Sequence, residues 1–399
     1  MSDRIQTSHA GSLPRPDDLV QVNLARSNGE NIDEAAFEPQ LGGAVADVVA
    51  RQRELGIDIV NDGEYGHSMG ERYDYGAWWS YVFPRLGGLE LTDVALLSAP
   101  QARPKPGEVA LASFAERRDW QQFAEAYDDP SSGAALPNRP PVTPVARGPI
   151  TYTGQEAIQR DISHFKAALD AQGLHDGYLN SVAPGSCARF GNEYYDDDEA
   201  LIYACADAMR EEYTAIIEAG LMLQLDDPAI AENWDQINPA PTVEAYQRFT
   251  RVRVEALNHA IRGLPPERIR FHLCWGSWHG PHVTDIPMAD IVELMLEINA
   301  GAYSFEAANV RHEHEWKLWQ DVRLPEGKKI LPGVVSHSTN VVEHPELVAE
   351  RIARFASGVG VENVIASTDC GLGGRVHPQI AWAKLEALSQ GAQLASRTL

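Results

Sequence analysis

From residue 148 onward, the chain alternates short apolar runs with helical patterns, and the connections between them are short. The runs include Leu221–Asp226, Ile269–Cys274 and Lys329–Val335, and the pattern Asp198–Gly220 is typical of a long helix ended by a glycine. Apolar runs of this length indicate buried parallel strands. Their alternation with helices predicts parallel β/α units, which right-handed crossovers wind into a barrel or an open sheet.

Four potential metal ligands lie at the ends of three predicted strands. His272 and Cys274 end the run that begins at residue 269, and Glu306 and Cys370 each end another apolar run. A (β/α)8 barrel carries its active site at the C-terminal ends of its strands. Ligands from three separate strands therefore favour an α/β chain folded as a closed (β/α)8 TIM barrel.

One imidazole, one carboxylate and two thiolates form a ligand set that suits zinc. Thiolate ligands add negative charge to the metal, so a thiol bound there stays a reactive thiolate, which is a nucleophile at neutral pH. The His-x-Cys pair alone is common by chance in a chain of 399 residues. Combined with the two further ligands at strand ends, it predicts zinc as cofactor and chemistry on sulfur.

The length leaves room for additions to one barrel. The 399 residues exceed the roughly 250 of a typical (β/α)8 barrel. We expect one domain over residues 1–399, with an N-terminal extension and an insertion at about 68–147. This segment is rich in proline, glycine and aromatic residues and is too long for an ordinary connection. We therefore expect it to pass over the barrel mouth.

The charge excludes some classes of partner. Lysine and arginine total 33 against 57 acidic residues, a formal net charge of −24, which argues against nucleic acid or an anionic membrane as partner. The sequence has no apolar run of 18 or more residues, and its first residues lack the features of a secretory signal. These properties predict a cytoplasmic protein. They are compatible with a homo-oligomer but do not fix the oligomeric state.

Four cysteines do not make a disulfide framework in a chain of this length. Cys205 lies in a helical pattern and is expected to be a small buried hydrophobic residue. Cys187, in the loop around residues 183–189, could approach the barrel mouth. We leave it unassigned, because the tetrahedral ligand set is complete without it.

Several motifs together resemble a known family. The ligand order His-x-Cys, Glu, Cys, with Gln224–Ala229 before it and Asp369–Gly373 at its end, is similar to the C-terminal catalytic barrel of cobalamin-independent methionine synthase and its single-barrel relatives. Near the N-terminus, Ser8–Arg15 resembles the family's opening glycine-serine turn, and Asp62–Glu64 resembles its second substrate-binding segment. The resemblance covers most of the chain.

The resemblance implies that zinc activates a thiol acceptor, which takes an alkyl group, most directly methyl, to give a thioether. In the methionine-forming members the acceptor is homocysteine. Ser12 would meet the acceptor's carboxylate end, while Glu64 and Asp226 would hold its ammonium, which has three donors and a positive charge. Two structural alternatives remain. Asp226 could cap the following segment, and Glu64 could pair with Arg72 or Arg15.

The partners implied by the resemblance are a small-molecule thiol and an alkyl donor. A leaving group that gains negative charge needs a proton, and His337, at the end of a predicted strand, is the candidate general acid. The full-length synthase holds its folate between two barrels, whereas this chain has room for one, so the donor stays open. Trp275 and Trp278 could wall a donor pocket or serve packing alone.

Three further interpretations compete with methyl transfer. A zinc-bound thiol could open an epoxide, as in relatives that use coenzyme M. A zinc hydrolase could draw on four histidines, although two thiolate ligands make zinc a poorer Lewis acid; these are His279, His282, His312 and His314. His312 and His314 could instead orient Glu306. A closed structural zinc site is disfavoured, because its ligands normally come from tight local pairs.

Overall fold

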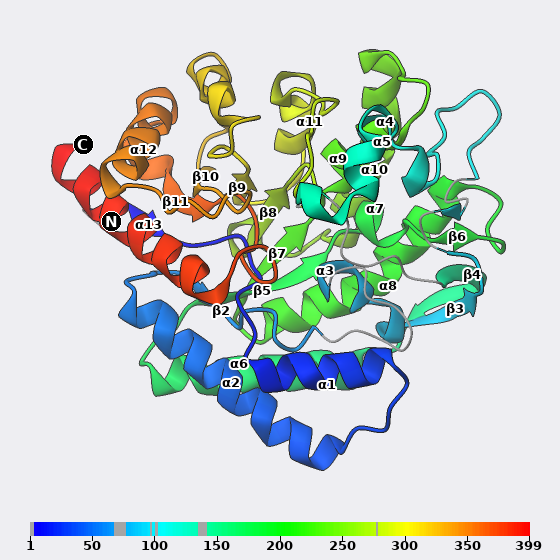
Figure 1. Ribbon diagram of the computed structural model, residues 1–399, viewed down its shortest axis with the longest axis horizontal. Helices are drawn as coiled ribbons and strands as arrows, with labels where there is room; N and C mark the ends of the chain where they lie inside the picture. The colour runs from blue at the N-terminus through cyan, green and yellow to red at the C-terminus, as the bar shows by residue number, and fades with distance from the viewer. Residues whose placement is uncertain (1–3, 68–76, 96–97, 100–102, 135–141, 277) are drawn as a thin grey trace.

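The computed structural model describes residues 4–67, 77–95, 98–99, 103–134, 142–276 and 278–399. Within these ranges, eight strands form one curled parallel sheet in the order β1-β11-β10-β9-β8-β7-β5-β2 (Figure 1). They are β1 (Gln6–Thr7), β2 (Val60–Asn61), β5 (Gly177–Val182), β7 (Met222–Asp226), β8 (Ile269–Leu273), β9 (Ala302–Phe305), β10 (Lys329–Val335) and β11 (Ile365–Thr368).

Backbone hydrogen bonds join the two ends of this sheet. The N–H groups of Asp58 and Ile59, just before β2, donate to the carbonyl oxygen of Thr7 in β1, at 3.2 and 3.0 Å. A closed sheet has no free edge that could pair with another chain. The structure confirms the predicted (β/α)8 barrel.

Helices separate consecutive strands and cover the outside of the barrel (Figure 1). They are α2 (Glu34–Glu54), α6 (Gln155–Ala171), α8 (Asp198–Glu218), α10 (Val243–Ala260), α11 (Val292–Leu296), the 3-10 helix Glu313–Gln320, α12 (Pro345–Val359) and α13 (Pro378–Thr398). Asp197 caps α8 by accepting from the N–H of Ala200 at 2.8 Å. The segment before β2 also contributes α1 (Asp17–Ser27), an addition to the one helix that a β/α unit requires.

The apolar segment from Met288 to Ala300, between β8 and β9, is not one continuous helix. It contains a 3-10 turn, Met288–Asp290, and the five-residue α11. Between them Ile291 takes φ −129° and ψ −8°, outside the helical region. The apolar pattern of this segment reflects burial against the barrel rather than one continuous helix.

The strands divide their side chains between two environments. In β7, Leu223 and Leu225 are buried in the apolar layer under the helices, whereas Gln224 and Asp226 take part in polar contacts. This alternation follows from the two-residue period of a strand. In β8, Arg270 donates to the Ser8 hydroxyl and the His9 carbonyl oxygen, both at 2.8 Å. The barrel interior is therefore polar and leads up to the C-terminal ends of the strands.

The long segment between β2 and α6 forms a separate layer. It includes α3 (Ala77–Ser80), β3 (Leu86–Thr92), α4 (Arg118–Gln122), α5 (Ala124–Asp128) and β4 (Thr143–Tyr152). Strands β3 and β4 pair antiparallel, and β6 (Gly191–Asn192) pairs with β4. The alternation expected from residue 148 onward begins with a strand and turn at Gly148–Gly154, and a strand is present there as the end of β4; however, β4 belongs to the small sheet and not to the barrel. The barrel strand that follows is β5.

Buried ion pairs and hydrogen bonds fix this segment to the barrel. Arg85 pairs with Asp161 of α6 at 2.6 Å and with Glu212 of α8 at 3.0 Å. At the C-terminal end of β5, the N–H of Val182 donates to the Tyr81 hydroxyl at 3.0 Å. None of the helices in the described ranges is both long and apolar enough to cross a membrane.

The far part of the segment lies on the loops that follow β7 and β8. After β8, the N–H of Val283 donates to Asp119 and the indole N–H of Trp278 donates to the Tyr127 hydroxyl, both at 2.9 Å. In the connection after β7, Asp235 accepts from the N–H of Asp119 at 2.9 Å. Both loops follow the C-terminal ends of strands. These contacts place α4 and α5 over the mouth side of the barrel.

Candidate metal and substrate site

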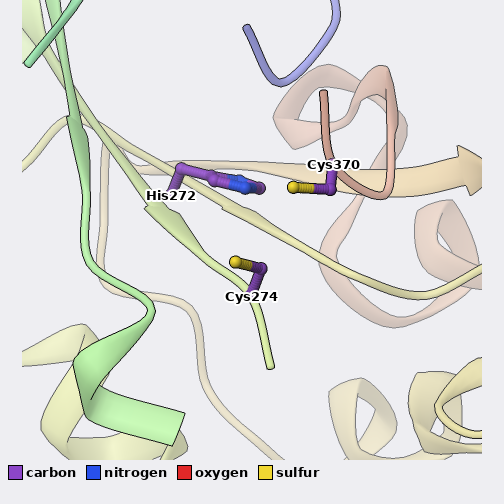
Figure 2. A group of neighbouring side chains, drawn as sticks. All are labelled: His272, Cys274 and Cys370. Carbon is purple, nitrogen blue, oxygen red and sulfur yellow. The ribbon is translucent and has the colours of Figure 1, made fainter. Parts of the chain in front are cut away.

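Three of the four predicted metal ligands converge at the barrel mouth. His272 points inward from β8, Cys274 follows that strand, and Cys370 follows β11. Their ligand atoms all lie within 4.8 Å of one another, and Figure 2 shows the three side chains directed toward a common point. A tetrahedral zinc ion bonded to nitrogen at about 2.0 Å and to sulfur at about 2.3 Å needs its donors roughly 3.5–3.8 Å apart. The cluster is compatible with that spacing.

The hydrogen bonding of His272 also fits a metal. Its Nδ1 lies 3.0 Å from the hydroxyl of Ser304 in β9. Its Nε2 is buried and has no hydrogen-bond partner in the described part of the chain. A proton on Nδ1, donated to Ser304, leaves the Nε2 lone pair free, which is the form of histidine that binds metals.

The two sulfur atoms differ in acidity. A hydrogen bond from Cys274, with the nearby His272, holds the pKa of Cys370 well below its ordinary value despite burial. The same hydrogen bond, together with burial, raises the pKa of Cys274. The hydrogen bond thus favours the thiolate form of Cys370, and a thiolate is the ligand form of cysteine.

The fourth predicted ligand, Glu306, lies next to this cluster in a second group. Glu306, His337 and Asp369 have ligand atoms within 4.8 Å of one another. One carboxylate oxygen of Glu306 accepts from the N–H of Trp275 at 2.9 Å, and the other accepts from Asn309 at 2.7 Å. Each oxygen keeps a further lone pair. The structure therefore puts Glu306 beside Cys274 but outside the three-residue cluster.

Asp369 is a site residue that the strand pattern did not single out. Its Oδ1 accepts from the N–H groups of Ala307 and Ala308, both at 2.7 Å. Burial raises the pKa of Asp369 to about 6, although the hydrogen bonds from these two N–H groups lower it. Its position immediately before Cys370, within the motif Asp369–Gly373, was the available signal.

His337 follows β10 and is buried at the same place. Its Nδ1 has no hydrogen-bond partner among the described residues. Burial lowers its pKa to about 4, so the imidazole is neutral at pH 7. The backbone carbonyl oxygen of His337 lies 3.4 Å from Nε2 of His279. The structure thus places an imidazole whose Nδ1 is unpartnered among the described residues beside Asp369 and Glu306.

A buried pair of carboxylates lies on the opposite side of the mouth. Burial raises the pKa of Asp226 to about 6, although His272, Asn180 and Gln224 lower it. Burial and the charge of Asp226 raise the pKa of Glu64 well above its ordinary value. Two like charges held together in a buried site favour the binding of a cation.

The two structural alternatives for these acids have different outcomes: the side chain of Asp226 has other partners, whereas the charge of Arg15 acts on the Glu64 carboxyl and lowers its pKa against burial. The oxygens of Asp226 accept from the amides of Asn180 at 2.9 Å and Gln224 at 2.8 Å, not from the backbone of the next segment. Arg15 donates to the backbone oxygen of Glu64 at 2.5 Å. Arg72 lies outside the described residues. Among the described residues, Nδ1 of His67 lies 3.8 Å from the Glu64 carboxylate, but burial lowers the pKa of His67 well below its ordinary value, which disfavours an ion pair.

Ser12 lies between the acid pair and the metal cluster. Its carbonyl oxygen accepts from the N–H groups of Leu372 and Gly373, at 2.9 and 3.0 Å, so its turn rests on the loop that carries Cys370. The preceding Gly11 has φ +143°, and a Cβ there would collide with Glu64. The turn therefore brings Ser12, Glu64 and Cys370 into one region.

The other tryptophan, histidine and cysteine candidates contact other side chains outside the metal cluster. Trp275 is buried and stacks on His312 with ring centroids 4.0 Å apart, so it does not line a donor pocket. His282 and His312 both bind Asp285, at 3.1 Å. Cys187 and Cys205 are buried outside the metal cluster, and a hydrogen bond from the Cys187 thiol to Cys205, together with burial, raises the pKa of Cys187.

A (β/α)8 barrel with histidine and two cysteines at its mouth is the architecture of a metal-dependent barrel enzyme. Residues 142–393 match the family described as the catalytic domain of cobalamin-independent synthase. The chain belongs to this family, and the resemblance to cobalamin-independent methionine synthase is confirmed.

Relatives by sequence are distant but cover nearly the whole chain. A 5-methyltetrahydropteroyltriglutamate–homocysteine methyltransferase of Chelativorans sp. is 22% identical over 97% of this chain and 42% of its own length. A methionine synthase of Thermococcus kodakarensis is 25% identical, over 99% of this chain and 94% of its own. The chain thus spans about two fifths of the length of the first of these relatives.

Among solved structures, a B12-independent methionine synthase from Shewanella sp. W3-18-1 in complex with selenomethionine has the same fold. Its TM-score is 0.70 at 19% identity, over 99% of this chain and 98% of that one. A putative vitamin-B12-independent methionine synthase from Listeria monocytogenes gives a TM-score of 0.62 at 18% identity, with 98% of each chain covered.

Proposed function

We propose that this protein is a zinc-dependent transferase that methylates the thiol of homocysteine or a closely similar amino thiol. The convergence of His272, Cys274 and Cys370 carries the proposal, with the unpartnered Nε2 of His272 facing two sulfur atoms. Family membership and the names of the relatives point to the same reaction. We also propose that residues 1–399 form one domain, with residues 68–147 as its insertion.

His272, Cys274 and Cys370 would hold zinc, with Glu306 as the fourth ligand. When bound, zinc supplies a positive charge that keeps an acceptor thiol deprotonated at neutral pH. The lowered pKa of Cys370 favours its thiolate form, and the Ser304 hydroxyl can accept a hydrogen bond from a proton held on Nδ1 of His272, which would leave Nε2 for the metal. The chain's own residues thus present a preformed ligand set.

The acceptor would lie across the mouth from Ser12 to the carboxylate pair. The turn at Ser12 would meet the acceptor's carboxylate, and Glu64 and Asp226 would bind its ammonium. A primary ammonium has three N–H donors and a positive charge, which offsets the two buried negative charges. The acid pair therefore favours an amino thiol over a sulfonate thiol such as coenzyme M.

His337 would supply a proton to the departing donor. It is buried beside the metal cluster, and its Nδ1 is free of other partners in the described ranges. Negative charge that develops on a leaving group next to it would favour its protonated form. The donor named for the relative from Chelativorans is 5-methyltetrahydropteroyltriglutamate, which makes a methyl-folate the first donor to test.

The proposal is tested by incubating the zinc-loaded protein with homocysteine and methyl donors and measuring methionine by mass spectrometry. Methionine formation with a methyl-folate or another methyl donor is the expected result. Thioether formation only from coenzyme M and an epoxide would favour the epoxide-opening reaction over methyl transfer. Failure of every thiol, together with zinc-dependent ester or amide cleavage, would replace the transferase with a hydrolase.

A further inference from the structure

Three buried side-chain amides connect the segments that carry Ser12, Glu64 and Asp226. They are Asn61 at the end of β2, Asn180 in β5 and Gln224 in β7, three neighbouring strands of the barrel. Their exposed fractions are 0%, 3% and 0%. Buried polar side chains in a strand need partners, and all three amide N–H₂ groups find them in the proposed acceptor site; Oε1 of Gln224 has none among the described residues.

Asn61 joins the first two segments. Its Nδ2 donates to the carbonyl oxygen of Gly11, the residue before Ser12, at 3.1 Å. Its Oδ1 accepts from the N–H of Gly63, the residue before Glu64, at 2.8 Å. Asn61 thereby fixes the two turns relative to each other, where Gly11 and Gly63 have φ of 143° and 71°.

Asn180 extends the connection to the third segment. Its Oδ1 accepts from Nδ2 of Asn61 at 3.1 Å, and its Nδ2 donates to Asp226 at 2.9 Å. Gln224 completes the set, because its Nε2 donates both to Asp226 at 2.8 Å and to the carbonyl oxygen of Ala10 at 2.6 Å. Each carboxylate oxygen of Asp226 thus receives one donor from the barrel interior.

The chemistry of an amide suits this place. A carboxamide donates and accepts hydrogen bonds without adding charge. Lysine or arginine here would neutralise the acid pair and remove its attraction for a cation, while a third carboxylate would add repulsion. Neutral donors fix Asp226 and leave the negative charge of Glu64 and Asp226 uncompensated by the amides.

We propose that Asn61, Asn180 and Gln224 form an amide scaffold that positions Glu64 and Asp226, with Asn180 as the positioning residue that sets selectivity for an amine-bearing thiol. This inference rests on the proposed function and extends it to the residues that determine acceptor choice. The amides act through the carboxylates and the turns and do not touch the acceptor's sulfur.

The test compares two thiols that differ only in the amine. Dissociation constants of homocysteine and of 4-mercaptobutanoate, which is homocysteine without its amine, are measured by calorimetry on the zinc-loaded protein. The wild type should prefer homocysteine by about tenfold or more, which corresponds to one charge-assisted hydrogen bond. Asn180→Ala should weaken homocysteine binding by about tenfold, change 4-mercaptobutanoate less than about threefold, and leave the zinc stoichiometry unchanged.

Two further variants separate positioning from general destabilisation. Asn61→Ala removes the hydrogen bonds to Gly11 and Gly63 in the two turns, and it should also reduce the preference for homocysteine. This variant keeps the test valid if Asn180→Ala folds poorly. Ser181→Ala is the matched control, since Ser181 neighbours Asn180 on β5 but bonds Glu212, at 2.7 Å. It should lower stability and leave the preference intact.

The outcomes distinguish the two levels of the proposal. An unchanged preference in Asn180→Ala and Asn61→Ala, or an equal loss for both thiols, would overturn the amide scaffold while leaving the transferase intact. A wild-type protein that binds both thiols equally, or neither, would contradict the proposed acceptor site and the scaffold with it.

Discussion

The carboxylate of Asp369 accepts a hydrogen bond from the backbone N–H of Ala307 at 2.7 Å, and so joins the loop after β11 to the loop after β9. Cys370 and Glu306 are the immediate neighbours of these two residues. The bond therefore fixes two proposed zinc ligands from different strands relative to each other. Gly333 makes room for it, because a Cβ at that position would collide with Asp369.

Asp369→Asn should weaken zinc binding by about 10- to 100-fold, the usual range for residues that orient metal ligands. The amide would place an N–H₂ group or a weaker acceptor against the two backbone N–H groups. Zinc affinity is measured by competition with a chromophoric chelator. Wild-type affinity in this variant would show that Asp369 does not position the ligands.

Cys370→Ala should abolish stoichiometric zinc binding, because it removes the thiolate of the cluster. The barrel should remain folded, since the apolar layer under its helices does not depend on this half-buried side chain. Metal analysis and far-UV circular dichroism are the measurements, and Cys205→Ala, a buried cysteine outside the cluster, is the control. Full zinc content in Cys370→Ala would refute the ligand assignment.

His337→Gln should reduce turnover by about 100-fold or more, in the range of general acid catalysis, while zinc content and homocysteine affinity stay the same. His279→Gln is the control, because the hydrogen bond of the His279 side chain is to the backbone oxygen of His337 and not to its imidazole. Steady-state rates and metal analysis are compared for both variants. Loss of zinc from His337→Gln would instead identify His337 as a metal ligand.

Glu232, in α9 (Ala229–Gln236), links the inserted segment to the barrel. It pairs with Arg117, and with Arg189 at 2.6 Å. Burial alone would raise its pKa, but the two guanidinium groups lower it to about 2. Glu232→Gln should therefore reduce the free energy of unfolding at pH 7 by about 3 kcal/mol, the cost of leaving a buried charge unpaired.

The pH dependence of this effect has a defined sign. The folded-state pKa of Glu232 is about 2, below the unfolded value of about 4.3. The ionised pair thus contributes its full stability above about pH 5, and this contribution is lost as the pH falls toward 2. Urea titrations should show the difference between wild type and Glu232→Gln shrinking over that range. Glu326→Gln, at an exposed site, is the control, and a pH-independent difference would contradict the account.

The sequence predicted most of the apolar strands and missed β5, which carries polar residues, and β1, which is very short. Residues 222–226 and 329–335 were recognisable from their apolar runs, whereas β5 contains Asn180 and Ser181, whose side chains serve buried hydrogen-bond networks. β1 has two residues, too few for a periodic signal. Strands that contribute to the site carry polar residues. These residues interrupt the apolar run by which a strand is recognised in a sequence.

The sequence predicted which candidate site residues lie at the ends of strands, but it did not predict their side-chain contacts. Position at the end of a strand brought His272, Cys274 and Cys370 together, because parallel strands share one C-terminal face. It could not show that Glu306 would bind Trp275 and Asn309, nor that amides from three strands would hold Asp226. Those contacts depend on loop conformations and rotamers, which the sequence does not encode at the level of a pattern.

The central claim is that the cluster of His272, Cys274 and Cys370 binds zinc and receives an amino thiol. Zinc X-ray absorption on the loaded protein, recorded before and after addition of homocysteine and then of coenzyme M, tests it most directly. The account predicts two sulfur neighbours at rest and three with homocysteine. An unchanged spectrum with homocysteine, or a third sulfur with coenzyme M alone, would contradict it.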